Sequence, residues 1–119
     1  MGLHGFGTVD ATEAIRLMGS DRAPLLIDIR SASERASQQI PGSIHVPLDT
    51  DFESKIKMLD SDAGYLLYCA TGVRSGRAVR SLQKNNLIQI SDIKGGIGAW
   101  TSNGGTITVA RADQKGAAI

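Results

Sequence analysis

Cysteine is scarce in this chain of 119 residues, which contains only Cys69. A single cysteine cannot form an internal disulfide, and with the two histidines it supplies no cluster that has the spacing of a zinc site. We therefore expect a reduced thiol, no metal and no cofactor. The length suffices for one domain that buries its own core without such crosslinks.

An excess of charge is also lacking, because 13 basic and 12 acidic residues give a formal net charge of +1. No basic run with interleaved aromatic residues is present, so we expect no nucleic-acid partner. No apolar stretch approaches the roughly 20 residues of a transmembrane helix, and residues 1–10 lack the order of a signal peptide. These features predict a cytoplasmic protein that does not bind membranes. The sequence leaves open whether the chain is a whole protein or one domain of a longer one.

Predicted helices and strands alternate along the chain. Asp10 as an N-cap, Glu13 at the capping-box spacing and Gly19 as a stop predict a short helix. Apolar runs predict strands over residues 25–29 and 65–68 that are covered on both faces. Further helices are expected over residues 31–39, 51–59 and 75–85, and further short strands over 43–47, 87–90 and 106–109. This order predicts an α/β fold with a central parallel sheet and helices on both faces.

Cys69 directly follows the strand predicted at residues 65–68. The loop after it leads into a predicted helix and consists of Ala70, Thr71, Gly72, Val73, Arg74 and Ser75. In open parallel sheets, ligands bind beyond the carboxyl ends of the strands. Unpaired amides and the positive end of the helix dipole favour a thiolate there, and Arg74 adds a permanent positive charge. The loop is therefore predicted to hold an activated sulfur nucleophile that handles an anion.

A lone cysteine in a small protein is more often a buried hydrophobic residue than a nucleophile. Two neighbours favour the reactive interpretation here. Gly72 permits the left-handed backbone that a tight loop needs, and Arg74 is poorly suited to a core. We therefore predict a reactive thiol at Cys69.

Other charged residues have structural explanations that compete with functional ones. Asp28 and Arg30 end an earlier strand, so their side chains are candidates for accessory roles at the same edge of the sheet. A structural ion pair between them is the favoured interpretation. Arg77 and Arg80 are interpreted mainly as a solvated helix face, with anion steering as the alternative.

Four segments resemble motifs of the rhodanese family of sulfurtransferases in order and spacing, across roughly residues 8–104. They are Asp28-Ile29-Arg30, the stretch from Ile40 to Pro47, the loop from Cys69 to Ser75, and Gly95-Gly96-Ile97-Gly98-Ala99-Trp100. The resemblance implies a central parallel sheet of about five strands. It also implies a rhodanese domain over residues 1–104, with a partly disordered C-terminal tail over residues 105–119.

The resemblance further implies a rhodanese-type thiosulfate sulfurtransferase in which Cys69 carries a persulfide. Its thiolate would take the outer sulfur of a donor such as thiosulfate and pass it to a thiol, to cyanide or to a protein acceptor. The amides from Ala70 to Ser75 would surround the persulfide, and Arg74 would hold an anionic donor. Gln38-Gln39 and Arg35 depart from the family's usual pattern, at a distance from the loop.

Two other functions compete with this interpretation. Some phosphatases share the fold, but their loops carry five residues between cysteine and arginine, where this chain has only residues 70–73. The tighter loop suits one sulfur atom better than a phosphoryl group. A persulfide carrier or regulatory module is the second alternative. Regulatory modules of this fold commonly lack the cysteine, whereas a carrier would retain Cys69 and differ from an enzyme only in its acceptor.

Overall fold

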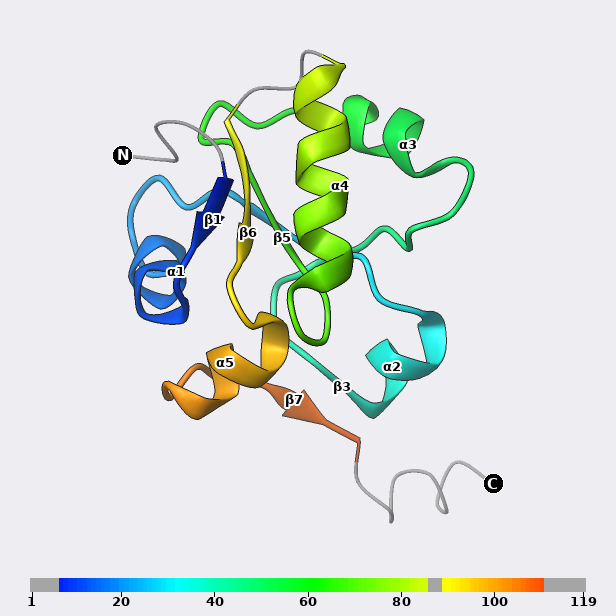
Figure 1. Cartoon of the computed structure of the whole chain (residues 1–119). Helices are drawn as coiled ribbons and strands as arrows, with labels where there is room; N and C mark the ends of the chain where they lie inside the picture. Colours follow the sequence, from blue (N-terminus) through cyan, green and yellow to red (C-terminus); the bar gives the residue numbers. More distant parts are fainter. Residues whose placement is uncertain (1–6, 86–88, 111–119) are drawn as a thin grey trace.

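A computed structural model describes residues 7–85 and 89–110. Its central sheet has five parallel strands in the order β1-β6-β5-β2-β4. The strands are β1 (Gly7–Val9), β6 (Ile90–Ile93), β5 (Tyr65–Tyr68), β2 (Leu25–Asp28) and β4 (Ile44–His45). The α/β fold with a central parallel sheet, predicted from the alternating pattern, is confirmed (Figure 1).

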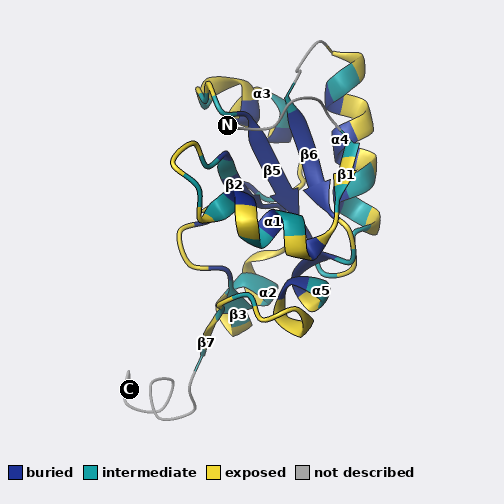
Figure 2. Cartoon of the chain, turned by 90° about the vertical axis from the view of Figure 1, so that its left-hand side faces the viewer, coloured by how far each residue is buried: buried dark blue, intermediate teal, exposed yellow. Residues whose placement is uncertain are grey.

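Helices cover both faces of the sheet, and each face has its own hydrophobic core. One core includes residues of α1 (Ala11–Met18) and α5 (Gly96–Ser102), and the other includes residues of α3 (Phe52–Met58) and α4 (Val73–Lys84). Side chains of β5 alternate between the two cores, because successive residues of a strand point to opposite faces. Figure 2 shows β5 and β6 as the buried centre of the molecule.

The predicted helix near the N-terminus forms as α1. The Asp10 carboxylate accepts the amide of Glu13 at 2.8 Å, which caps the first turn, and Gly19 ends the helix. Glu13 does not complete a capping box, because its carboxylate pairs with Arg16 at 2.6 Å. A complete capping box occurs instead in α2 (Ala32–Ser37), between Ser31 and Glu34.

Several element boundaries differ from those expected. The predicted helix over residues 31–39 ends at Ser37, because Gln38–Gln39 forms strand β3, which pairs antiparallel with β7 (Thr108–Val109). Helix α4 begins at Val73 rather than at residue 75, because Gly72 is in the left-handed conformation (φ 95°) and serves as the N-cap. The strand expected from residue 87 begins at Ile90, and residues 86–88 lie outside the described part of the chain.

The C-terminal segment begins as a structured extension of the domain. The Ala110 amide donates to the Ser37 carbonyl at 2.9 Å, next to the β3–β7 pair. The expected frayed end falls mainly on residues 111–119, which lie outside the described residues. Among the helices of residues 7–85 and 89–110, none has the length and apolar character needed to cross a membrane.

Candidate active site

The Cys69 thiol lies inside a ring of donors made by its own loop. Its Sγ accepts the amide of Gly72 at 3.0 Å and the amide of Ser75 at 3.4 Å. The Ser75 hydroxyl lies 3.5 Å from the same sulfur. The Cys69 side chain is 0% exposed and belongs to the core that α3 and α4 cover. The predicted juxtaposition of thiol and loop amides therefore forms, in a site enclosed by protein.

Two opposing effects act on the acidity of the Cys69 thiol. Burial raises the pKa of the thiol, since a thiolate loses hydration there. The Ser75 hydroxyl and the amides of Ser75, Gly72 and Thr71 stabilise the thiolate and lower the pKa. The lowering effects prevail, so the pKa of Cys69 lies below its ordinary value. A buried, inert cysteine would have its pKa raised, so the environment favours a nucleophile.

The first turn of α5 hydrogen-bonds to the first two residues of the Cys69 loop. The Ile97 amide donates to the Cys69 carbonyl at 2.9 Å, and the Gly98 amide donates to the Ala70 carbonyl at 3.4 Å. Gly96 has φ 62°, and a Cβ atom at this position would overlap the carbonyl oxygens of both loop residues. Close backbone contact therefore explains Gly96 of the fourth motif, whereas Gly95 has φ 78° and leaves no room for a Cβ atom beside the Ala99 side chain.

Arg74 holds the loop to helix α2. Its Nη1 and Nη2 donate to the two carboxylate oxygens of Glu34 at 2.9 and 2.8 Å. The Arg74 bond is the main reason that the pKa of Glu34 is lowered to about 2. The sequence predicts that Arg74 holds an anionic donor and gives no indication of Glu34. The structure shows this guanidinium engaged with a carboxylate 40 positions earlier.

Asp28 and Arg30 form an ion pair in the interior. The Arg30 Nε and Nη2 donate to the two Asp28 oxygens at 3.0 Å each. Arg35 Nη1 also reaches Asp28 Oδ2 at 3.2 Å, and the Tyr68 hydroxyl donates to the same oxygen at 3.1 Å. Desolvation raises the pKa of Asp28, but the Arg30 bonds and the Tyr68 bond outweigh it and leave the pKa lowered. The structure thus shows the ion pair that the sequence analysis favoured.

A second buried carboxylate, Asp92, was missed by the sequence analysis. Its Oδ2 accepts the Ser75 hydroxyl at 2.8 Å, and its Oδ1 accepts the Thr8 hydroxyl at 2.8 Å. Ser75 thereby connects Asp92 to the sulfur of Cys69. The signal available in the sequence was an acidic residue between Ile90 and Ile93, close after the strand predicted over residues 87–90.

The remaining residues of interest lie around this centre. A cavity of about 290 Å³ borders Ala70 and is also lined by Arg30, Glu34, Ser37, Gln38, Ile97 and Gly98. Thr71 and Val73 are exposed on the outer side of the loop, as are Arg77 and Arg80 on α4. The loop residues are thus placed between the buried thiol and the molecular surface.

Known proteins share both the sequence pattern and the fold. The chain is 36% identical over 79 residues to the uncharacterized protein YqhL of Bacillus subtilis, a match that covers 66% of this chain and 62% of that protein. It is 26% identical over 96 residues to a sulfurtransferase of Allochromatium vinosum, with 81% of this chain and 89% of that protein covered. The crystal structure of a rhodanese-related protein from Thermoplasma volcanium superposes with a TM-score of 0.74 at 29% identity, covering 87% of this chain and 98% of that one.

The family model for the rhodanese-like domain matches residues 10–103. This range contains strands β2, β4, β5 and β6 of the sheet and the complete Cys69 loop, and β1 directly precedes it. The matched range, the parallel sheet and the cysteine loop agree with the resemblance carried by the four sequence motifs. This chain therefore belongs to the rhodanese-like domain family.

Proposed function

We propose that the protein is a sulfurtransferase that carries sulfur as a persulfide on Cys69. The observation that supports this most directly is the convergence of the Gly72 and Ser75 amides on Sγ, at 3.0 and 3.4 Å. Donors in this arrangement stabilise an anionic sulfur. The lowered pKa of Cys69 follows from the same contacts and provides a thiolate for attack.

The first step transfers sulfur from a thiosulfate-like donor to Cys69. The thiolate attacks the outer sulfur, a new S–S bond forms, and the S–S bond of thiosulfate breaks to release sulfite. The charge is conserved, since a thiolate and a dianion become a persulfide anion and a sulfite dianion. The loop amides of residues 70–75 stabilise the charge, and no proton transfer is needed.

The second step passes the outer sulfur to an acceptor. A thiolate or cyanide attacks it, the persulfide S–S bond breaks, and Cys69 leaves as a thiolate stabilised by the same amides. Arg74 contributes its positive charge to the loop, and the Arg74 and Cys69 charges stabilise each other. A protein acceptor uses the same chemistry, so an enzyme and a persulfide carrier differ only in the acceptor that attacks the persulfide.

Intact-mass measurement tests the persulfide directly. Incubation with thiosulfate should add one sulfur atom to the native chain, and cyanide should remove it. Cys69→Ser should gain no sulfur and lose sulfur-transfer turnover, because a hydroxyl is far less nucleophilic. The variant keeps nearly the same side-chain size, so circular dichroism should show an unchanged fold. A native chain that gains no sulfur from several sulfane donors contradicts the proposal.

The size of the loop distinguishes sulfur transfer from phosphate hydrolysis. Four residues separate Cys69 from Arg74, and both loop amides that contact Sγ converge on a single atom. We expect negligible hydrolysis of aryl phosphates by the native chain. Inserting one glycine between Gly72 and Val73 should reduce sulfur transfer, because it widens the ring of amides. Substantial phosphatase turnover by the native chain would overturn the assignment.

A further inference from the structure

Glu34 occupies both terminal nitrogens of Arg74, the basic residue of the Cys69 loop. The Nη1 and Nη2 atoms donate to one carboxylate oxygen each, at 2.9 and 2.8 Å. A guanidinium binds carboxylates and phosphates through this same two-point geometry, and a sulfonate group presents similar oxygens. An anionic sulfur donor that reaches the loop must therefore compete with Glu34 for the hydrogen-bond donors of Arg74.

The Glu34 carboxylate is fixed in place by its own helix. Its Oε1 accepts the Ser31 amide at 3.0 Å, and the Ser31 hydroxyl accepts the Glu34 amide at 3.2 Å, which completes the capping box of α2. The pKa of Glu34 is lowered to about 2, so the carboxylate is ionised at neutral pH. Because Glu34 belongs to the same chain as Arg74, it competes with a free anion at a high effective concentration.

Arg74 lies close to the reacting sulfur. It directly precedes Ser75, whose amide and hydroxyl both contact the Cys69 Sγ, and the charges of Arg74 and Cys69 stabilise each other. Glu34 offsets part of the positive charge of Arg74 from the other side. The ion pair therefore provides less compensation for a second negative charge on a donor than a free guanidinium would provide.

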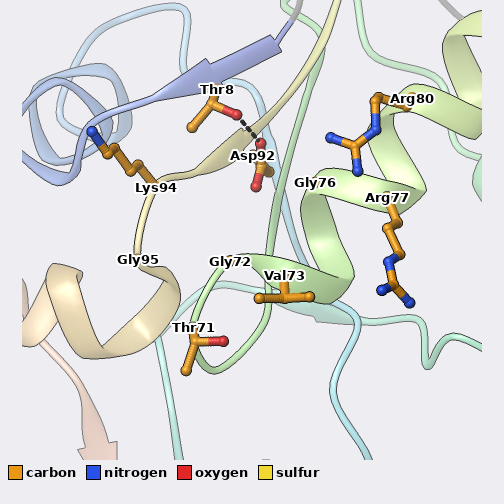
Figure 3. Close-up of a pocket in the computed structure, with 10 residues that line it drawn as sticks. All are labelled: Thr8, Thr71, Gly72, Val73, Gly76, Arg77, Arg80, Asp92, Lys94 and Gly95. Carbon is orange, nitrogen blue, oxygen red and sulfur yellow. Dashed lines mark hydrogen bonds between the residues drawn. The ribbon is translucent and has the colours of Figure 1, made fainter.

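Three other basic side chains near the loop do not replace Arg74. Arg77, Arg80 and Lys94 border a cleft of about 510 Å³ on the outer side of the loop. Figure 3 shows the Arg77 and Lys94 side chains pointing away from Arg80. These three charges therefore do not converge on one anion.

The cations at the end of β2 are engaged as well. Arg30 forms the two-point pair with Asp28, and Arg35 reaches the same carboxylate at 3.2 Å. Arg30 is only 2% exposed, so its charge is held inside the fold. Discrimination among donors by charge therefore depends on Arg74 and on the carboxylate that occupies it.

We propose that Glu34 is a specificity-determining residue, which selects sulfur donors with one negative charge over dianions such as thiosulfate by occupying Arg74; this inference rests on the proposed function. Thiosulfonates belong to the favoured class, because a carbon group replaces one charged oxygen of thiosulfate. The Cys69 thiolate attacks the outer sulfur of methanethiosulfonate, the S–S bond of the donor breaks, and methanesulfinate leaves. The charge is conserved, since two monoanions give the persulfide anion and the sulfinate anion.

Thiosulfate and methanethiosulfonate provide a matched pair of donors, because both present an outer sulfur and they differ by one charge. In Glu34→Gln, the rate constant for persulfide formation from thiosulfate, followed by intact mass, should rise about tenfold, because Arg74 becomes available for a charge-assisted bond. For methanethiosulfonate it should rise by at most about threefold. The ratio of the two rate constants cancels any change in the reactivity of Cys69, because the same sulfur attacks both donors.

Glu13→Gln is the matched control, because it removes a carboxylate from another two-point pair. Arg16 donates to Glu13 at 2.8 and 2.6 Å on α1, which packs in the core opposite to that of Cys69. The donor ratio should keep its native value in this variant. In Glu34→Gln/Arg74→Gln the ratio should return close to the native value, since the gain requires Arg74. A native ratio in Glu34→Gln, or a ratio that stays raised in the double variant, would overturn the proposal.

Binding of unreactive anions tests this selection without sulfur chemistry. Sulfate replaces the dianionic donor and methanesulfonate replaces the monoanionic one, and the amide NMR signals of residues 73–75 report binding. The Kd for sulfate should fall about tenfold in Glu34→Gln, and the Kd for methanesulfonate should fall much less. If the native chain forms no persulfide, the proposed function fails, while the sulfate titration still shows whether Glu34 selects against dianions. Equal affinities of the native chain and Glu34→Gln for sulfate would contradict the role of Glu34.

Discussion

Two buried carboxylates lie at the same edge of the sheet in different surroundings. Asp28, at the end of β2, is 0% exposed, and Asp92, in β6, is 1% exposed. Asp28 forms a two-point ion pair with Arg30. Within the described part of the chain, Asp92 accepts only the hydroxyls of Thr8 and Ser75 and forms no ion pair.

This difference separates a structural role from a functional one. A buried charge is costly unless it is paired and hydrogen-bonded. The Asp28–Arg30 pair therefore mainly stabilises the fold at the carboxyl end of β2. Asp92 has no cation of its own, and its charge acts on the Ser75 hydroxyl. Ser75 in turn contacts the Cys69 sulfur at 3.5 Å. We infer that Asp28 controls stability and that Asp92 controls the acidity of the thiol.

Removing the charge of Asp28 should have the largest effect on folding. Asp28→Asn leaves Arg30 buried and uncompensated, so the free energy of unfolding should fall by about 3–5 kcal/mol. Urea unfolding at neutral pH measures this change. In the double variant Asp28→Leu/Arg30→Met, both charges are replaced by apolar groups, and much of the loss should be recovered. If Asp28→Asn lowers the free energy of unfolding by less than about 1 kcal/mol, Asp28 has no larger structural role than Asp92, and the inferred difference between the two carboxylates is wrong.

Removing the charge of Asp92 should change the thiol more than the fold. In the native chain the Ser75 hydroxyl proton can turn either to Sγ or to Asp92 Oδ2. In Asp92→Asn the amide can donate to Ser75, so the hydroxyl proton is no longer drawn to residue 92, and a nearby negative charge disappears. Both effects stabilise the thiolate, so the pKa of Cys69 should fall further. Stability should change by about 1 kcal/mol. Ultraviolet titration of the thiolate measures the pKa without ambiguity, because Cys69 is the only cysteine.

Thr8→Val is the matched control for the Asp92 prediction. It removes the hydroxyl from Oδ1 of Asp92 and leaves the Ser75 bond to Oδ2 in place. The pKa of Cys69 should therefore move less than in Asp92→Asn. A pKa that rises in Asp92→Asn, or that moves equally in both variants, would show that Asp92 does not act through Ser75.

Much of the carboxyl edge of the sheet could be predicted from the sequence, because the patterns that indicate it lie close together in the chain. The apolar runs of β2 and β5 identified two adjacent strands of the sheet, and the position of Cys69 after β5 placed the thiol at its carboxyl edge. Gly72 and Arg74 indicated a tight, charged loop. The order and spacing of the four motifs then indicated the rhodanese family, which the match over residues 10–103 confirms.

The contacts that were missed depend on long-range pairing. Strands β3 and β7 have two residues each, and their pairing connects Gln38 to Val109, so neither has a periodic pattern long enough to recognise. Glu34 and Arg74 meet across 40 positions, although each is unremarkable where it stands in the sequence. Asp92 belongs to the site only because β1 and α4 bring Thr8 and Ser75 to it.

The smallest effect is expected at the edge of the loop, where the pair of Glu34 and Arg74 is partly exposed, at 32% and 40%. After allowance for solvent screening, Glu34→Gln should lower the free energy of unfolding by about 1 kcal/mol at neutral pH. Folding depresses the pKa of Glu34 from 4.5 to about 2. This stabilisation is therefore complete above pH 4.5 and is lost as the pH falls toward 2, where the native chain and the variant should converge. Glu13→Gln, in the more exposed pair with Arg16, should have a smaller effect. A difference between native and Glu34→Gln that persists unchanged down to pH 2 would show that the ion pair is not its source.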